Sequence, residues 1–528
     1  MNMQNKNILF ILFILIVIFV GIFLYSDHVP VDFMEPRNYI AAREMIESGS
    51  WLLPTMEGKL RIAKPPLPTW ITALAMMWAG TDTNLTADRI PAGICALLLC
   101  IFTFLIVKRV SGDRRIAVAS LLILATNYLF MLAARRNEWD IYAYMAMAGA
   151  VWALLEALMR KNGKPIFFLL FSLFMAVSFY SKGPVAFWAM LLPFLISYII
   201  AYGPKALLEN KGGLVWSFIL CALLSGLWPL YVYVNAPHVA ASVASQESSA
   251  WFKTSINPFW AYLANMYKIV GIWLPLLLYG MAVPFIEKEK KPEEKLFAFW
   301  FILTVFSLSI FPEKRMRYIL PAVVPGSVIP AMVIYRLREA RGWAWKIVYG
   351  AFCMIAGILF AAVAGILVYY SPGKVHAIPG AVLLGLVGGA LVYQFVARKT
   401  KNAHITAIVG VCLCVVFLLP MVSQLLGPDD ARKFMHVREN PELMQRDFCV
   451  MPQDLLSDTV TYDIRWAIAK NIQSVIEYHA NSWTKKGKID PYVLITAQNV
   501  ERRAKMFKWR LADKITTKRA TYYIYLIP

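Results

Sequence analysis

Apolar segments long enough to cross a membrane recur along most of this chain. A transmembrane helix needs about 20 mainly apolar residues. The composition agrees, because 59% of the 528 residues are hydrophobic and only 16% are charged, which is too apolar for a set of soluble domains. The sequence therefore predicts an α-helical polytopic membrane protein with about 13 transmembrane helices, near residues 8–26, 90–107, 116–133, 141–159, 165–180, 184–202, 214–234, 266–286, 296–311, 318–335, 345–370, 378–396 and 404–425.

The loops between these segments alternate in charge. Loops richer in Lys and Arg usually stay cytoplasmic, and here they are 108–115, 160–164, 203–213, 287–295, 336–346 and 397–404. We therefore expect a cytoplasmic N-terminus, a retained first helix, and a tail from residue 427 on the outside. The short apolar stretch 69–80 is expected to be an interfacial or half-inserted helix on the outer face.

The net charge of +21 fits cytoplasmic loops and contacts with anionic lipid or phosphate, and no basic-aromatic module indicates nucleic-acid binding. Six of the seven cysteines lie in apolar runs, and the six histidines are scattered. These patterns predict neither a disulfide framework nor a metal site.

Several cations lie in loops that we expect to face outward, where the charge bias disfavours them. Each either anchors the chain at lipid headgroups, pairs with a nearby acid, or holds an anion. Lys182 is the most informative, because "FYSKGPVAF" joins two spans with almost no loop, and a cation there indicates a bound anion such as phosphate. They include Arg37, Arg43, Arg61, Lys64, Arg135, Arg136, Lys182, Lys314, Arg315 and Arg317.

Two outer loops carry local signals. In the first, "EPRNYIAAREMIESG" (35–49) predicts a short amphipathic helix on the membrane, with Pro36 in its first turn and Gly49 as its stop. Lys64 precedes a Pro-Pro step, which fixes an extended backbone. In the second, Asp140 precedes an apolar run, so it either caps the following helix, serves a site, or does both.

These motifs together resemble a known family. The string "EPRNYIAAREMIESGSWLLPTMEGKLRIAKPPL", the Arg-to-Asp segment of the second loop, "SKGP" and "KRMRYILP" occur in order. The chain resembles the bacterial 4-amino-4-deoxy-L-arabinose lipid A transferases, which are related to the protein O-mannosyltransferases within the GT-C membrane glycosyltransferases. The resemblance implies a GT-C fold with juxtamembrane helices on the outer face.

The resemblance also implies an enzyme of the bacterial inner membrane, acting on its periplasmic face. Such an enzyme moves a sugar from a polyprenyl (undecaprenyl) phosphate to an envelope acceptor such as lipid A or another glycolipid or glycan. By this resemblance Arg37, Lys64 and Lys182 bind the donor phosphate, with Arg317 and Tyr318 near the same cavity and Asp140 as the second-loop acid. We expect Arg43, Arg61, Arg136 and Glu138 to line that cavity.

The chain departs from the family at three acidic positions, where it has Met34, Ile40 and Ala63. Two of the family's acids are associated with a metal, so no cofactor is assigned and a divalent metal is left open. Asp32 and Glu35 are equally near substitutes for the missing base. Besides transfer to a lipid or glycan, two readings stay open: a protein O-glycosyltransferase, and a non-catalytic binder of lipid-linked sugar.

Chemistry favours an inverting single displacement. Cations stabilise a departing polyprenyl phosphate, and a hydroxyl acceptor needs a carboxylate base whereas a phosphate acceptor does not. A transporter is disfavoured because the sequence has no internal repeat and no charge deep inside a span. We expect a monomer in contact with membrane lipids.

The tail differs from the transmembrane domain 1–426, whose first outer loop is 27–89. Residues 427–528 alternate strand-like and helix-like pieces, which predicts a small extracytoplasmic α/β domain. Strands are expected at 459–464, 491–497 and 521–528, and helices at 465–480 and 500–510. Its many cations fit either an acidic acceptor, anionic headgroups or solvent; they include Lys485, Lys486, Lys488, Arg502, Arg503, Lys505, Lys508 and Arg510.

Overall fold

The computed structural model divides the chain into two compact units. Unit 1 comprises residues 1–29, 62–68 and 89–421, and unit 2 comprises 30–61, 69–88 and 422–528. The structure describes residues 3–32, 34–160, 163–243, 245, 257–287, 291–340, 345–370, 377–397, 402–426, 430–451, 462–468, 472–475, 478, 490–498, 500–517 and 520–528. The predicted division at residues 426 and 427 stays a prediction.

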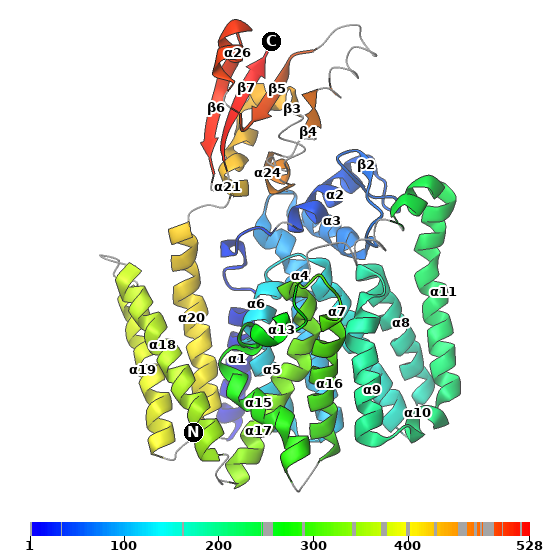
Figure 1. Ribbon diagram of the computed structural model, residues 1–528, viewed down its shortest axis with the longest axis vertical. Helices are drawn as coiled ribbons and strands as arrows, with labels where there is room; N and C mark the ends of the chain where they lie inside the picture. Colours follow the sequence, from blue (N-terminus) through cyan, green and yellow to red (C-terminus); the bar gives the residue numbers. More distant parts are fainter. Residues whose placement is uncertain are drawn as a thin grey trace. The chain divides into compact units, whose positions relative to one another are not determined.

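Unit 1 is helical throughout the part that the structure describes (Figure 1). Its elements are α1 (Met3–Ile22), η1 (Ser26–His28), α4 (Leu85–Ser111), α5 (Arg114–Ala125), α6 (Tyr128–Ala134), α7 (Trp139–Met159), α8 (Lys164–Lys182), η2 (Phe187–Leu191), α9 (Leu192–Tyr202), α10 (Lys205–Glu209), α11 (Lys211–Asn235), α13 (Ala261–Ala264), α14 (Met266–Val270), η3 (Gly271–Trp273), α15 (Leu274–Ile286), α16 (Pro292–Ser309), η4 (Met316–Ala322), α17 (Val323–Ala340), η5 (Trp345–Tyr349), α18 (Gly350–Tyr370), α19 (Ala377–Val396) and α20 (Ala403–Leu426).

The helices make this a multi-pass membrane protein. Within the described residues, ten helices are long and apolar enough to cross a membrane, or eleven if the bent pair α5 and α6 forms one span. The predicted count of about 13 is not confirmed. The expected span at 116–133 bends by 68° between α5 and α6. The one at 184–202 is a shorter apolar helix, Phe187–Tyr202, and α16, with Glu293, Glu294 and Lys295 in its first turn, is not among the ten.

Arg135, one of the cations that the sequence predicts to face outward, has a structural role at the end of α1. The buried guanidinium donates hydrogen bonds to the carbonyl oxygens of Val20, Gly21 and Leu24, at 2.5, 2.5 and 3.1 Å, and to that of Met131 at 3.0 Å. It therefore satisfies acceptors that a helix end leaves without intrahelical partners. Burial lowers the pKa of Arg135 to about 10.

Unit 2 combines most of the loop 27–89 with the tail. Its elements are α2 (Glu35–Ser48), β1 (Thr55–Met56), β2 (Lys59–Leu60), α3 (Leu67–Ala79), α21 (Asp430–Met435), η7 (His436–Glu439), α22 (Pro441–Met444), β3 (Asp447–Val450), α24 (Tyr462–Ile468), β4 (Ile472–Ser474), β5 (Tyr492–Thr496), α26 (Glu501–Met506), β6 (Arg510–Thr516) and β7 (Thr521–Ile527). One hydrophobic core holds Tyr39 and Met45 of α2, Met76 of α3, Trp466 of α24 and Ile524 of β7. The loop and the tail therefore fold against each other.

The tail forms a five-stranded mixed sheet in the order β4-β3-β5-β7-β6 (Figure 1). Strand β3 is parallel to β4 and β5, and β7 is antiparallel to β5 and β6. The strands predicted at 491–497 and 521–528 are confirmed, as is helix at 501–506. The strand predicted at 459–464 is wrong for 462–464, which are helical, and 459–461 lie outside the described residues.

One further tail prediction needs correction. The helix predicted over 465–480 ends at Ile468, and 472–474 form strand β4. Strands β3 and β6 were not predicted from the sequence. Strand β6 follows α26 closely, and the charge-rich segment 501–510 continues across that change of structure, whereas β3 has only four residues.

The predicted helix at 35–49 is confirmed as α2. Pro36 lies in its first turn, and Gly49 ends it with a φ of 69°, a conformation that glycine adopts without strain. Its polar residues Asn38, Arg43 and Glu44 are buried together with its apolar ones. The Asn38 side-chain amide donates a hydrogen bond to the Thr72 hydroxyl of α3 at 2.9 Å and accepts one from the Thr69 hydroxyl at 2.8 Å. Helix α2 is thus packed on several sides, more than a one-sided amphipathic helix requires.

Candidate functional site

Three elements of unit 1 bring charged side chains together. Helix α8 ends at Lys182, and the next residue, Gly183, turns the chain with a φ of 72° and a ψ of −152°, a conformation open essentially only to glycine. Helix α7, which packs along α8, carries Asp140 in its first turn. The helix η4 carries Arg317 and Tyr318 and contacts α7.

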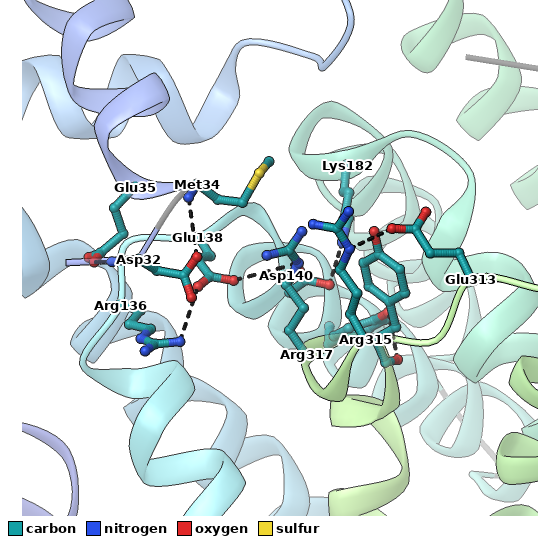
Figure 2. Close-up of polar contacts among 12 residues, drawn as sticks. Asp32, Met34, Glu35, Arg136, Glu138, Asp140, Lys182, Glu313, Arg315 and Arg317 are labelled. Atoms are coloured by element: carbon teal, nitrogen blue, oxygen red, sulfur yellow. Dashed lines mark hydrogen bonds and ion pairs between the residues drawn. The ribbon is translucent and has the colours of Figure 1, made fainter. Parts of the chain in front are cut away.

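Lys182 and Asp140 form a buried ion pair, with side chains only 10% and 6% exposed (Figure 2). The ammonium of Lys182 also lies over the ring of Tyr318, 4.9 Å from its centroid, and the guanidinium of Arg317 lies 5.4 Å from the same centroid. Two cations therefore share one aromatic ring, which attracts positive charge through its π-electrons. Asp140 is not the N-cap residue of α7, because Glu138 occupies that position, but it lies in the first turn, where an acid complements the helix dipole.

Glu138 links the remaining charges of this cluster (Figure 2). Its carboxylate lies 3.9 Å from Arg136 and 4.0 Å from Arg317. Lys64, in the short segment of the first loop that belongs to unit 1, acts on Lys182 as a neighbouring positive charge. The cluster of Lys64, Arg136, Lys182 and Arg317 with Glu138 and Asp140 therefore holds four cations and two carboxylates. This excess of positive charge favours an anionic ligand.

Two buried tyrosines support η4, and the sequence analysis missed both. The Tyr262 hydroxyl donates a hydrogen bond to the backbone carbonyl oxygen of Arg315 at 3.2 Å. The Tyr144 hydroxyl lies 3.5 Å from the backbone carbonyl oxygen of Tyr318. Burial raises the pKa of Tyr262, so it stays a neutral donor. The signal available in the sequence was a tyrosine within an apolar segment, since a buried hydroxyl needs a polar partner.

The other predicted acids, Asp32 and Glu35, lie in unit 2 at the start of α2. Glu35 is fully buried, and its carboxylate accepts hydrogen bonds from the backbone amide of Asp32 at 3.1 Å and from the Tyr39 hydroxyl at 2.9 Å. The Asp32 carboxylate accepts from the backbone amide of Met34 at 3.3 Å. Both acids therefore help to shape the turn into α2.

The predicted cations of unit 2 have distinct surroundings. Arg37 is half-buried on α2. A guanidinium nitrogen of Arg61 lies 3.5 Å from the sulfur of Met56 in β1. Arg43 lies 3.4 Å from Asp82, which also receives two hydrogen bonds from Arg438, at 3.1 and 3.3 Å. Burial opposes the ionisation of Asp82, but Arg438 and then Arg43 outweigh it and lower the pKa of this carboxyl.

Comparisons with known proteins found one matching family and several similar proteins. The family described as dolichyl-phosphate-mannose-protein mannosyltransferase matches residues 63–229. An uncharacterised protein of Aquifex aeolicus is 28% identical over 55% of this chain and 57% of its own length. The undecaprenyl phosphate-alpha-4-amino-4-deoxy-L-arabinose arabinosyl transferase 1 of Proteus mirabilis is 25% identical over 64% of this chain and 61% of its own.

The matches to these two relatives thus cover less than two thirds of the relatives' lengths. Among solved structures, ArnT from Cupriavidus metallidurans bound to undecaprenyl phosphate has a TM-score of 0.74 and 15% identity, and it covers 99% of this chain and 98% of its own. The fold is therefore shared over nearly the full length. This chain therefore has an ArnT-like fold and is similar in sequence, over part of its length, to the family and the relatives named above.

The structure bears on the absence of acids at positions 34, 40 and 63. Ile40 is buried in the core of unit 2, where an acid would be unfavourable without partners. Among the residues that the structure describes, no group of three or more His, Cys, Asp or Glu side chains converges as metal ligands. The described residues therefore do not form a metal site with three or more such ligands.

Proposed function

We propose that this ArnT-like protein is a glycosyltransferase that takes a sugar from a polyprenyl phosphate and passes it to an acceptor of the cell envelope. The observation that carries the proposal is the cluster of four cations and two carboxylates in unit 1, in which Lys182 and Arg317 lie against the Tyr318 ring. The names of the relative and of the solved structure, which include undecaprenyl phosphate, support the donor class.

The donor phosphate would bind among Lys182, Lys64 and Arg317. Lys182 is already oriented by Asp140 and by the ring, so little conformational freedom is lost when phosphate binds. Arg317 offers a planar fork suited to phosphate oxygens. Arg37, on α2 of unit 2, remains a third predicted phosphate ligand beside the two lysines, and Arg43, Arg61, Arg136 and Glu138 remain predicted cavity residues.

Transfer would proceed by a single displacement with inversion. An acceptor oxygen forms a bond to the anomeric carbon while the bond from that carbon to the phosphate oxygen breaks, and its electron pair leaves on the phosphate. The cations stabilise this growing negative charge, which is the largest contribution that such a site can make. A charged donor held in this way also exposes the face of the sugar opposite the phosphate.

Asp140 is our choice for the acid of the site. Its carboxylate lies in the charge cluster, holds Lys182 in position, and is a base that can accept the proton of an acceptor hydroxyl. Glu35 fits less well, because both of its oxygens already accept hydrogen bonds in unit 2. Asp32 stays an alternative base. A phosphate acceptor needs no base, so lipid A and other phosphorylated glycolipids are compatible with the missing acids.

The proposal places the chain in the bacterial inner membrane with its N-terminus in the cytoplasm and unit 2 in the periplasm. The alternation of basic loops supports this orientation. The partners would be the lipid-linked donor, a lipid or glycan acceptor and membrane lipids, and the chain would act as a monomer.

The test compares lipid extracts by mass spectrometry. Cells that lack the chain are complemented with the wild-type protein, Lys182→Ala or Lys205→Ala. Without the chain, a polyprenyl phosphate carrying one sugar should accumulate and one envelope glycan should lose that sugar, and Lys182→Ala should reproduce both changes. Lys205 is an exposed cation that pairs with Glu209 on α10, so its loss is the matched control.

Four outcomes can be told apart. Rescue by wild type and Lys205→Ala but not by Lys182→Ala supports the transferase. Rescue by Lys182→Ala refutes the role of that lysine. Unchanged donor and glycan masses in cells that lack the chain would favour the non-catalytic binder instead, and sugar lost from a protein would favour the protein O-glycosyltransferase.

A further inference from the structure

One face of the C-terminal sheet carries a row of aromatic rings. Tyr523 and Tyr525 of β7 stack with centroids 6.3 Å apart, Trp509 lies 6.1 Å from Tyr525, and Phe507 stacks on Trp509 at 6.0 Å. Tyr525 is buried and forms the floor of the row, whereas Phe507 is 55% exposed. The row therefore reaches the surface at Phe507 as an aromatic platform.

Cations border this platform. Lys514 of the edge strand β6 is opposite Tyr523 in the register and lies 5.4 Å from the centroid of its ring. Arg503, Lys505 and Lys508 are exposed in and just after α26, next to Phe507. The acid Asp513 points to the other face, since it is opposite Ile524 and pairs with His436 at 2.6 Å.

Flat rings beside cations suit one kind of ligand. The apolar faces of sugar rings pack on aromatic side chains, and phosphate or carboxylate groups pair with neighbouring Lys and Arg. The predicted cations Lys485, Lys486 and Lys488 lie outside the described residues and are not needed for this surface.

We propose that this surface, formed by Phe507, Trp509, Lys514 and Tyr523, binds an anionic saccharide. The inference rests on the proposed function only in identifying that saccharide with the acceptor of the transfer. Binding itself needs no transfer, so it can be measured whether or not the protein proves to be an enzyme.

The test is isothermal titration of the full-length protein in detergent with a water-soluble glucosamine disaccharide carrying two phosphates. Phe507→Ala and Lys514→Ala should each raise Kd by about three- to tenfold, because each removes one stacking or cation contact. Arg510→Ala is the matched control. Arg510 is a neighbouring cation on the opposite face, where it is opposite Leu526 and pairs with Glu442.

Phe507 and Lys514 are both exposed, so their variants should keep the wild-type melting temperature. Wild-type affinity in Arg510→Ala together with weaker binding in the other two supports the proposal, as does weaker binding of the same disaccharide without its phosphates. Equal affinity in all variants overturns it, and so does an absence of binding to the wild type. Binding to phosphatidylglycerol vesicles but not to the disaccharide overturns it in favour of a membrane contact.

Discussion

The buried ion pair between Asp140 and Lys182 should make single and double substitutions differ in stability. Both side chains are at most 10% exposed, so removing one leaves a buried charge without its partner. Such a loss typically costs about 3–5 kcal/mol, whereas replacing both members by apolar residues of similar size is often close to neutral. Asp140→Leu and Lys182→Met should each be strongly destabilising, and the double variant should recover most of the loss.

Equilibrium unfolding of the purified protein in mixed detergent and SDS gives the three free energies. We expect the loss in the double variant to be smaller than the sum of the single losses by about 2–4 kcal/mol. The double variant should nevertheless fail to rescue donor consumption in cells, because it lacks the phosphate-binding lysine. Losses that simply add, within about 0.5 kcal/mol, would refute the reasoning, since the two groups would then be independent.

Two further predictions concern groups outside the proposed donor site. Asp82 has a lowered pKa in the folded protein, so its contribution to stability is complete above the unfolded value of about 3.9 and is lost as pH falls through the lower folded value. Asp82→Asn should therefore lower the melting temperature at pH 7 and flatten its decline between about pH 5 and 3; an equally steep decline would contradict this. Arg135→Lys should reduce the melting temperature nearly as much as Arg135→Ala, because one ammonium cannot reproduce the planar fork that reaches four carbonyls; full stability in Arg135→Lys would contradict it.

The sequence predicted the features that follow from periodicity and local chemistry. Helix α2 could be bounded from Pro36 and Gly49, and the strands β5 and β7 could be recognised from continuous apolar and aromatic runs. The bend between α5 and α6 could not, because the apolar run continues across it while Asn127 caps α6 by accepting a hydrogen bond from the amide of Phe130. A cap inside an apolar run is easily overlooked.

The candidate site could be predicted only in part, because its charged side chains come from distant parts of the sequence. Lys182 was singled out because a cation at a span end is unusual, but its partner Asp140 is 42 residues away and no local pattern connects them. The joint core of the first loop and the tail was equally hidden, since Tyr39 and Trp466 are separated by most of the chain yet lie with ring centroids 5.2 Å apart. Tertiary packing decides such contacts.

The central claim is that the cation cluster of unit 1 holds the phosphate of a lipid-linked sugar. Native mass spectrometry of the protein purified from cells that make the donor tests it most directly. The account predicts a bound polyprenyl phosphate sugar on the wild type and on Lys205→Ala, and its loss from Lys182→Ala. Equal occupancy of the wild type and Lys182→Ala by that lipid would contradict the account.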